Sequence, residues 1–144
     1  MNPDPFDLQR FVDAQEAVYP SVRAELARGR KTSHWMWFIF PQLAALGRSG
    51  TARFYGLLDA SHARAYWTHP TLGARLNECC RLVISVEGRS AHDIFGSPDD
   101  LKLCSCMTLF EAAVPDAPVF GEVLDRFYGG ARDSQTEALL LQAR

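Results

Sequence analysis

Polar side chains recur at regular spacing within the apolar stretch between residues 98 and 114. They stand three residues apart, at Asp99, Lys102, Ser105 and Thr108. This spacing places them on one side of a helix, with each residue shifted slightly around the axis from the one before. Polar side chains on a buried helix need hydrogen-bond partners or water. One interpretation is a pocket in which Lys102 binds an anion or moves a proton, Asp99 orients it, and the hydroxyls donate hydrogen bonds. The other is a salt bridge at a helix start, followed by two hydroxyls bonded back to the backbone.

A histidine stands beside two large aromatic rings earlier in the chain. His34 directly precedes Trp35, and Trp37 follows two residues later. Indole rings can stack on a planar ligand or a cation, and an imidazole titrates near neutral pH. Gln42 and Arg48 come shortly after, and a guanidinium can bind a phosphate or a carboxylate through two hydrogen bonds. Core packing could equally require the two rings, and the histidine could be a structural hydrogen-bonding group.

The other candidate groups form no familiar catalytic or metal-binding motif. Cys79 and Cys80 are adjacent, and Cys104 and Cys106 are separated by one residue, so neither pair has the C-x-x-C spacing of a zinc or redox site. The four histidines lack metal-ligand spacing, and the sequence has no G-x-S-x-G, H-E-x-x-H or glycine-rich phosphate loop. We therefore expect reduced cysteines that pack as small apolar residues, no metal and no cofactor.

The elements that must position these residues are predicted to be helices. A length of 144 residues with 47% hydrophobic residues is typical of one domain, spanning residues 1–144. Apolar residues at helical spacing, punctuated by prolines and glycines, predict an all-α fold of about seven or eight short helices in an irregular array. These are expected at residues 6–18, 20–29, 34–46, 59–67, 70–83, 98–114, 120–127 and 134–141. Residues 35–40 could instead form a buried strand, because aromatic and branched side chains dominate there.

Polar residues that precede several of these helices are expected to accept hydrogen bonds from the first backbone N–H groups. Ser97 gives the clearest signal, because a proline occupies the next position and an acid the third. The other expected caps are Thr32 or Ser33, Asp59, His69, and Ser134 with Glu137. His62 and His92 are expected at the surface.

Charge and hydropathy exclude some classes of protein. The longest apolar run, Trp35 to Phe40, has six residues, far fewer than the roughly 18 to 20 that span a bilayer. We therefore expect a cytoplasmic protein that does not enter membranes. The formal net charge is −2, whereas nucleic-acid-binding domains are usually strongly basic. The basic cluster Arg28, Arg30 and Lys31 is interpreted as a solvated helix end, with nucleic-acid binding the least favoured alternative.

Several strings of residues carry a resemblance to a known family. They are F-D-L-Q-R-F at 6–11, G-R-K at 29–31, S-H-W-M-W-F-I-F-P-Q-L at 33–43, D-I-F-G at 93–96 and the stretch from Asp100 to Phe110. In these the chain resembles the bacterial domain-of-unknown-function family 1810, over nearly its whole length. The resemblance implies a small, distorted all-helical fold and no established reaction. Members often carry the label "calpastatin", which does not fit, because calpain inhibitors of that type are long, repetitive and disordered.

Three functional hypotheses follow. The leading one is a domain that binds a small planar anion resembling a nucleotide, and that could hydrolyse it: Trp35 or Trp37 would stack, Lys102 and Arg48 would meet the anion, and His34 or Asp99 would handle protons. The second is a protein-interaction module without catalysis. The third comes from a looser similarity to NADAR proteins, which process ADP-ribose conjugates: an H-W dipeptide followed by an acid, a lysine and a methionine on one helix.

Overall fold

Ten α-helices and one 3-10 helix lie within residues 3–142, the range described by the computed structural model. The predicted all-α class is confirmed. The helices are α1 (Gln9–Glu16), α2 (Tyr19–Arg28), α3 (Met36–Ile39), η1 (Ala44–Leu46), α4 (Gly50–Phe54), α5 (Ala60–Thr68), α6 (Pro70–Ser85), α7 (Ala91–Phe95), α8 (Asp99–Ala113), α9 (Val119–Tyr128) and α10 (Ser134–Gln142). No helix within this range is both long enough and apolar enough to cross a membrane.

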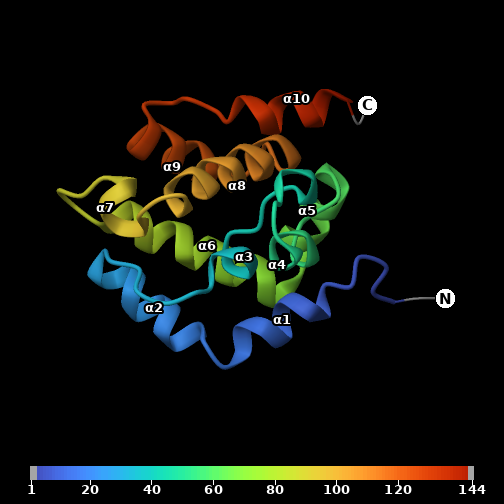
Figure 1. The fold of residues 1–144 in the computed structure, drawn as a ribbon, viewed down its shortest axis with the longest axis horizontal. Helices are drawn as coiled ribbons and strands as arrows, with labels where there is room; N and C mark the ends of the chain where they lie inside the picture. The colour runs from blue at the N-terminus through green and yellow to red at the C-terminus, as the bar shows by residue number, and fades with distance from the viewer. Residues whose placement is uncertain (1–2, 143–144) are drawn as a thin grey trace.

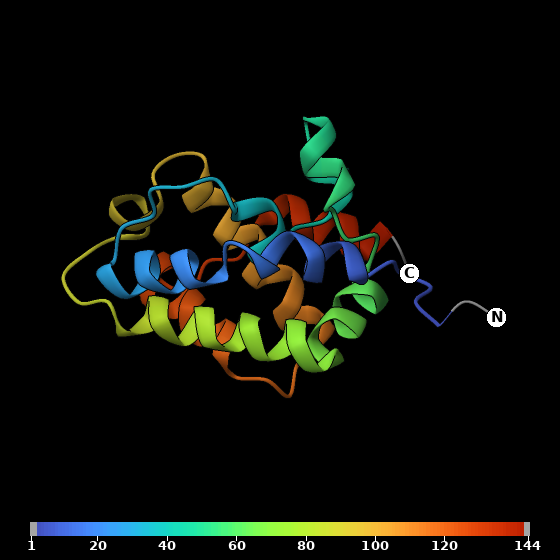
Figure 2. The ribbon, with the colours of Figure 1, turned by 90° about the horizontal axis from the view of Figure 1, so that it is seen from below.

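Helix α8 crosses the middle of the molecule, with α9 and α10 on one side and α6 and α2 on the other (Figure 1). It packs directly against α5, α7, α9 and α10. On the face opposite α6, the segment carrying η1 and α4 projects from the body of the molecule (Figure 2). This projecting segment forms one wall of a pocket beside the N-terminal end of α8.

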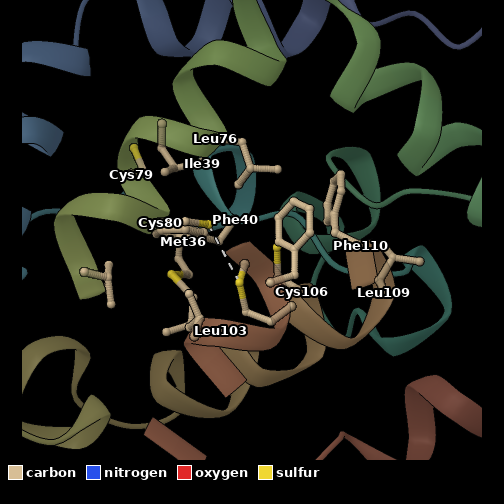
Figure 3. Close-up of a cluster of buried hydrophobic side chains, with 14 of the residues drawn as sticks. Met36, Ile39, Phe40, Leu76, Cys79, Cys80, Leu103, Cys106, Leu109 and Phe110 are labelled. Atoms are coloured by element: carbon tan, nitrogen blue, oxygen red, sulfur yellow. Dashed lines mark hydrogen bonds between the residues drawn. The ribbon is translucent and has the colours of Figure 1, made fainter. Parts of the chain in front are cut away.

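The apolar face of α8 forms the centre of the core. Leu103, Met107 and Phe110 are buried there, and Figure 3 shows Leu103 and Phe110 among side chains from α3 and α6. The Cys80 sulfur lies 3.8 Å from the Met107 sulfur. Burial raises the pKa of Cys80 and Cys106 well above that of a free thiol. Both thiols therefore pack as small apolar residues, as predicted.

The predicted continuous helix at residues 34–46 is wrong, and so is the alternative of a strand at residues 35–40. Helix α3 is one turn long and ends at Ile39, because Pro41 lacks a backbone N–H and disfavours helical geometry in the preceding residue. The chain then extends, and Leu43 forms an isolated parallel bridge with Leu57. A Cβ on Gly56 would lie 2.3 Å from the Ala44 Cα, so only glycine allows this close approach.

The predicted caps had mixed outcomes. Asp59 and His69 accept hydrogen bonds at the starts of α5 and α6, as predicted. Ser97 is not a cap, because α8 begins one residue later with Pro98 in the cap position and no side-chain cap bond. Neither Thr32 nor Ser33 caps α3, whose cap position is occupied by Trp35.

The start of α10 and two short helices also differ from expectation. Asp133, rather than Ser134, accepts from the Thr136 backbone N–H at 2.9 Å, because α10 itself begins at Ser134. Helices α4 and α7 were not predicted. Each has five residues and is capped by a serine, Ser49 and Ser90 respectively, and neither is long enough to display a periodic apolar face.

Candidate functional site

A pocket of about 610 Å³ opens between the η1–α4 segment and the N-terminal ends of α8 and α10. It is lined by Gln42, Leu46, Arg48, Ser49, Ala52, Pro98, Leu101, Lys102, Ser105, Asp133, Ser134 and Gln135. Four of the predicted site residues therefore share one cavity: Gln42, Arg48, Lys102 and Ser105. They come from sequence positions up to 63 apart, and the fold alone brings them together.

Each wall of the pocket is fixed by a local feature of the chain. The bridge between Leu43 and Leu57 places Gln42 and η1, and the Gln42 carbonyl accepts from the Leu57 N–H at 2.9 Å. Ser49 accepts from the Ala52 N–H at 3.0 Å and starts α4. Helix α8 presents Lys102 and Ser105 from the opposite wall.

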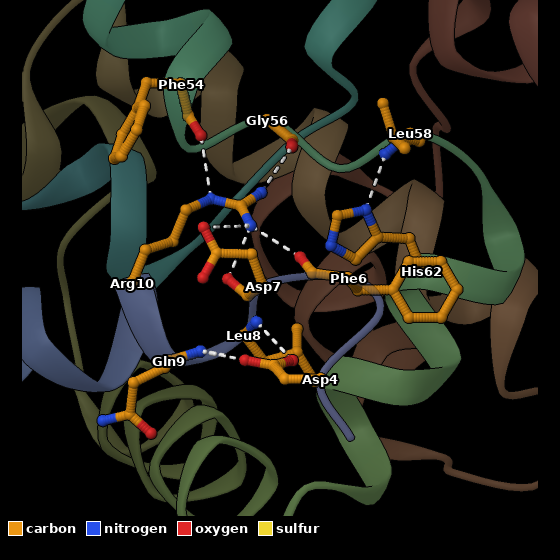
Figure 4. Close-up of polar contacts among 10 residues, drawn as sticks. All are labelled: Asp4, Phe6, Asp7, Leu8, Gln9, Arg10, Phe54, Gly56, Leu58 and His62. Carbon is orange, nitrogen blue, oxygen red and sulfur yellow. Dashed lines mark hydrogen bonds and ion pairs between the residues drawn. The ribbon is translucent and has the colours of Figure 1, made fainter. Parts of the chain in front are cut away.

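Arg10 anchors the projecting segment to the body of the protein. Its guanidinium donates to the Phe54 carbonyl at 2.9 Å, and to the carbonyls of Phe6 and Asp7 at 2.6 Å each. Figure 4 shows this guanidinium between the N-terminal segment and the turn after α4. Arg10 thereby connects α1 with the wall of the pocket that carries α4.

His62 lies beneath this same region and not at the surface, so the surface prediction for it is wrong. Its side chain is buried, stacks on Phe6 with ring centres 4.7 Å apart, and accepts from the Leu58 N–H through Nδ1 (Figure 4). Burial, together with the positive charge of Arg10, lowers the pKa of His62 to about 4. A neutral imidazole is what this environment requires, because a protonated Nδ1 cannot accept the Leu58 hydrogen bond. His92 is exposed, as predicted.

Lys102 is the central cation of the site. Its ammonium nitrogen lies 3.9 Å from Asp99 Oδ1 and 5.8 Å from the centre of the Trp37 ring. The predicted salt bridge with Asp99 is therefore present but long. Trp37 lines a narrow crevice that shares Gln42, Ala52 and Lys102 with the large pocket. The Trp37 ring thus lies near the ammonium group but does not line the pocket itself.

The second carboxylate oxygen of Asp99 forms an ion pair with another lysine. Lys31 lies 2.9 Å from Asp99 Oδ2 and donates to the Ser33 carbonyl at 2.6 Å. Its side chain is only 8% exposed, and its ammonium sits 5.0 Å from the centre of the Trp35 ring. The interpretation of Lys31 as part of a solvated basic helix end is wrong. Arg28 and Arg30 are exposed.

The two predicted hydroxyls both bond back to the helix backbone. Ser105 Oγ donates to the Leu101 carbonyl at 3.2 Å, and Thr108 Oγ1 donates to the Cys104 carbonyl at 2.8 Å. Thr108 also accepts from the Asp133 N–H at 2.9 Å. Ser105 lines the pocket, whereas Thr108 connects α8 to the segment that begins α10.

Two residues predicted for the site point elsewhere. His34 is exposed and does not line the pocket. Trp35 is 1% exposed, and its indole N–H donates to Glu25 at 3.1 Å. Trp35 is therefore a core residue. Among the residues that the structure describes, no aromatic ring lines the large pocket.

Glu25 organises the loop that leads to these residues. Its buried carboxylate accepts from the backbone N–H groups of Thr32 and Ser33 at 2.7 and 2.9 Å, and from the Ser33 hydroxyl and the Trp35 indole. Burial alone raises the pKa of a carboxyl group, but these hydrogen bonds outweigh it and lower the pKa of Glu25 to about 2. Glu25 is thus ionised and fully engaged in structure.

Sequence reasoning missed Lys31, Ser49, Asp133 and Gln135 as members or neighbours of the site. One signal was available: the chain has 15 lysines and arginines, and only Lys31 and Lys102 are lysines. Within the part of the chain that the structure describes, no group of three or more His, Cys, Asp or Glu side chains is arranged to hold a metal ion.

A model for the family described as "Protein of unknown function (DUF1810)" matches residues 5–140. The chain is 55% identical to the conserved hypothetical protein Rv1873 from Mycobacterium tuberculosis, whose crystal structure it matches with a TM-score of 0.95 over 96% of this chain and 99% of that one. No curated protein matches the chain. The matched ranges include the helices that build the pocket.

Proposed function

Since the chain belongs to the DUF1810 family, for which no reaction is defined, we propose from its pocket that the protein binds a small anionic molecule. The observation that carries this proposal is one cavity of about 610 Å³ lined by both Arg48 and Lys102. Its size lies within the range of roughly 300 to 1,000 Å³ that is typical of small-molecule sites. A phosphate or carboxylate is the group that two such cations bind best.

The charges around the pocket leave a positive excess. Lys31 and Asp99 form a close pair at 2.9 Å, so their charges largely offset each other. Asp133, the one acid among the described residues of the wall, accepts from the Thr136 N–H and hydroxyl at 2.9 and 2.6 Å. The first residues of α10, Ser134 and Gln135, also line the pocket, and a helix N-terminus carries partial positive charge.

The remaining wall suits an organic ligand better than a bare ion. Leu46, Ala52 and Leu101 line the pocket beside its polar groups, and Leu101 is 62% exposed. Gln42 and Ser105 add groups that can donate and accept hydrogen bonds. A molecule with an anionic end and an apolar or planar body, such as a nucleotide, meets both kinds of surface.

The proposal concerns binding and assigns no reaction. His34 lies outside the pocket, and Asp99 is engaged by two lysines. Neither residue lines the pocket in which the anion would bind.

Isothermal titration calorimetry of the purified protein with inorganic phosphate, nucleotides, NAD and ADP-ribose tests the proposal. Replacement of Lys102 or Arg48 by alanine should weaken any binding about ten- to hundredfold, since hydrogen bonds between charged groups contribute roughly 1.5 to 3 kcal/mol. Arg28→Ala is the matched control, because Arg28 is an exposed cation that does not line the pocket.

Three results would contradict the proposal or change its content. Equal weakening by Arg28→Ala would indicate nonspecific charge attraction. Binding of ADP-ribose in clear preference to other nucleotides would support the hypothesis based on NADAR proteins. No binding by any member of the panel would oppose the proposal and favour a protein-interaction module.

A further inference from the structure

The only two lysines of the chain converge on one carboxylate. Lys31 approaches Asp99 Oδ2 at 2.9 Å and Lys102 approaches Oδ1 at 3.9 Å. Each lysine also sits over its own tryptophan, Lys31 at 5.0 Å from the Trp35 ring centre and Lys102 at 5.8 Å from that of Trp37. Both lysines thus contact Asp99 and an indole ring, but they differ in their distance from the carboxylate and in their exposure to solvent.

Lys31 is fixed far more firmly than Lys102. Its ammonium has the Ser33 carbonyl at 2.6 Å in addition to Asp99, and its side chain is 8% exposed. The Lys102 side chain is 27% exposed and lines the pocket. Asp99 is therefore bound mainly by the lysine that is largely buried, and only loosely by the one that is more exposed.

We propose that Lys31 is a positioning residue, which occupies Asp99 so that this carboxylate does not neutralise Lys102. The inference rests on the proposed function for its purpose, because the freed ammonium of Lys102 is the group that would meet an anionic ligand. Without Lys31, Asp99 would be left with one cation, and Lys102 would close the 3.9 Å gap to pair with it directly.

A lysine suits this role better than an arginine would. An ammonium is a compact point charge that fits between one carboxylate oxygen, one carbonyl and the face of an indole, whereas a guanidinium spreads its donors over a planar fork. All thirteen other basic residues are arginines. The two lysines are therefore placed where a compact charge is required.

The first test requires no ligand. Because the chain has two lysines, mass spectrometry can follow acetylation of the Lys102 amine by acetic anhydride in the intact protein. In Lys31→Met the amine should react at least about threefold more slowly, since pairing with Asp99 withdraws it. In Asp99→Asn it should react faster, but by a smaller factor, because Asp99 holds Lys102 only loosely at 3.9 Å. The double variant Lys31→Met with Asp99→Asn should return to the wild-type rate or exceed it. Lys31→Arg keeps the charge without the compact shape, so its rate should lie between those of Lys31→Met and the wild type.

The second test measures binding of inorganic phosphate by NMR titration of the same variants. Lys31→Met should weaken phosphate binding, and the added Asp99→Asn substitution should restore it. A merely structural role for Lys31 would not produce opposite effects of the two single substitutions on the reactivity of Lys102.

The outcomes separate the inference from the proposed function. An unchanged Lys102 acetylation rate in folded Lys31→Met overturns the inference, even if phosphate binds. If circular dichroism shows that Lys31→Met does not fold, Asp99→Asn decides, because Lys31 keeps its bond to the Ser33 carbonyl there; an unchanged rate in that variant overturns the inference too. The expected order of rates without phosphate or nucleotide binding would support the control of Lys102 and contradict the proposed function.

Discussion

Glu25 and Asp99 both anchor the loop of residues 30–35, but they are satisfied in different ways. Glu25 is surrounded by neutral donors: two backbone N–H groups, one hydroxyl and one indole. Asp99 faces two ammonium groups, and one of them reaches a pocket. A carboxylate enclosed by neutral donors can only stabilise the fold, whereas one shared by two cations also sets how much charge each cation presents to a ligand.

The largest expected effect is the loss of the Glu25 charge. Glu25→Gln places an amide NH₂ against groups that all donate, which should lower the free energy of unfolding by roughly 2 to 4 kcal/mol, because buried donors lose a charged acceptor. Urea denaturation measures the change. Glu87→Gln, at an exposed position, is the control and should alter stability by less than about 0.5 kcal/mol; an equally small effect at Glu25 would remove the contrast with Asp99.

The Glu25 carboxylate should also make the free energy of unfolding depend on pH. The pKa of Glu25 is lowered from 4.5 to about 2 in the folded protein, so the unfolded chain binds more protons between these values. Its contribution, on the order of 3 kcal/mol, is fully present above about pH 4.5 and is lost as the pH falls toward 2. Urea titrations at several pH values should show this loss in the wild type. The part due to Glu25 should be missing in Glu25→Gln, and parallel pH profiles of the two proteins would refute the assignment.

Loss of the Asp99 charge should cost less than loss of the Glu25 charge. Asp99→Asn leaves Lys31 its bond to the Ser33 carbonyl, and the Asp99 side chain is 20% exposed. We expect a loss of about 1 to 2 kcal/mol, between the values for exposed and buried ion pairs. Thermal unfolding followed by circular dichroism provides the measurement. A loss as large as that of Glu25→Gln would mean that Asp99 is a structural anchor of the same kind.

The smallest effects are expected at two hydroxyl side chains of α8, one structural and one on the pocket wall. Thr108→Val removes the acceptor of the Asp133 N–H and should lower stability by about 1 kcal/mol without changing anion binding. Ser105→Ala, at the pocket wall, should change stability by less than about 0.5 kcal/mol and weaken binding. Calorimetric titration and urea denaturation of both variants give the two readouts, and a reversed pattern would place Thr108 in the site.

The sequence by itself determined the fold class, the family and most of the long helices. Apolar side chains at helical spacing are a local property, and so are the caps at Asp59 and His69. The same local reasoning placed Asp99, Lys102 and Ser105 on one sector of α8, because their positions depend only on helix geometry. Short elements such as α4 and the single turn of α3 could not be predicted in this way, since they contain too few residues to show helical periodicity of apolar side chains.

Only the tertiary structure decided which of these residues share a site. Trp35 and Trp37 are two residues apart, yet one is enclosed beside Glu25 and the other contacts Lys102, because one helical turn directs them differently. Lys31 belongs to a basic cluster in the sequence, but in the fold it is buried against Asp99, 68 positions away. Charge and spacing can be read along the chain, whereas burial and partnership arise from long-range packing that no local pattern records.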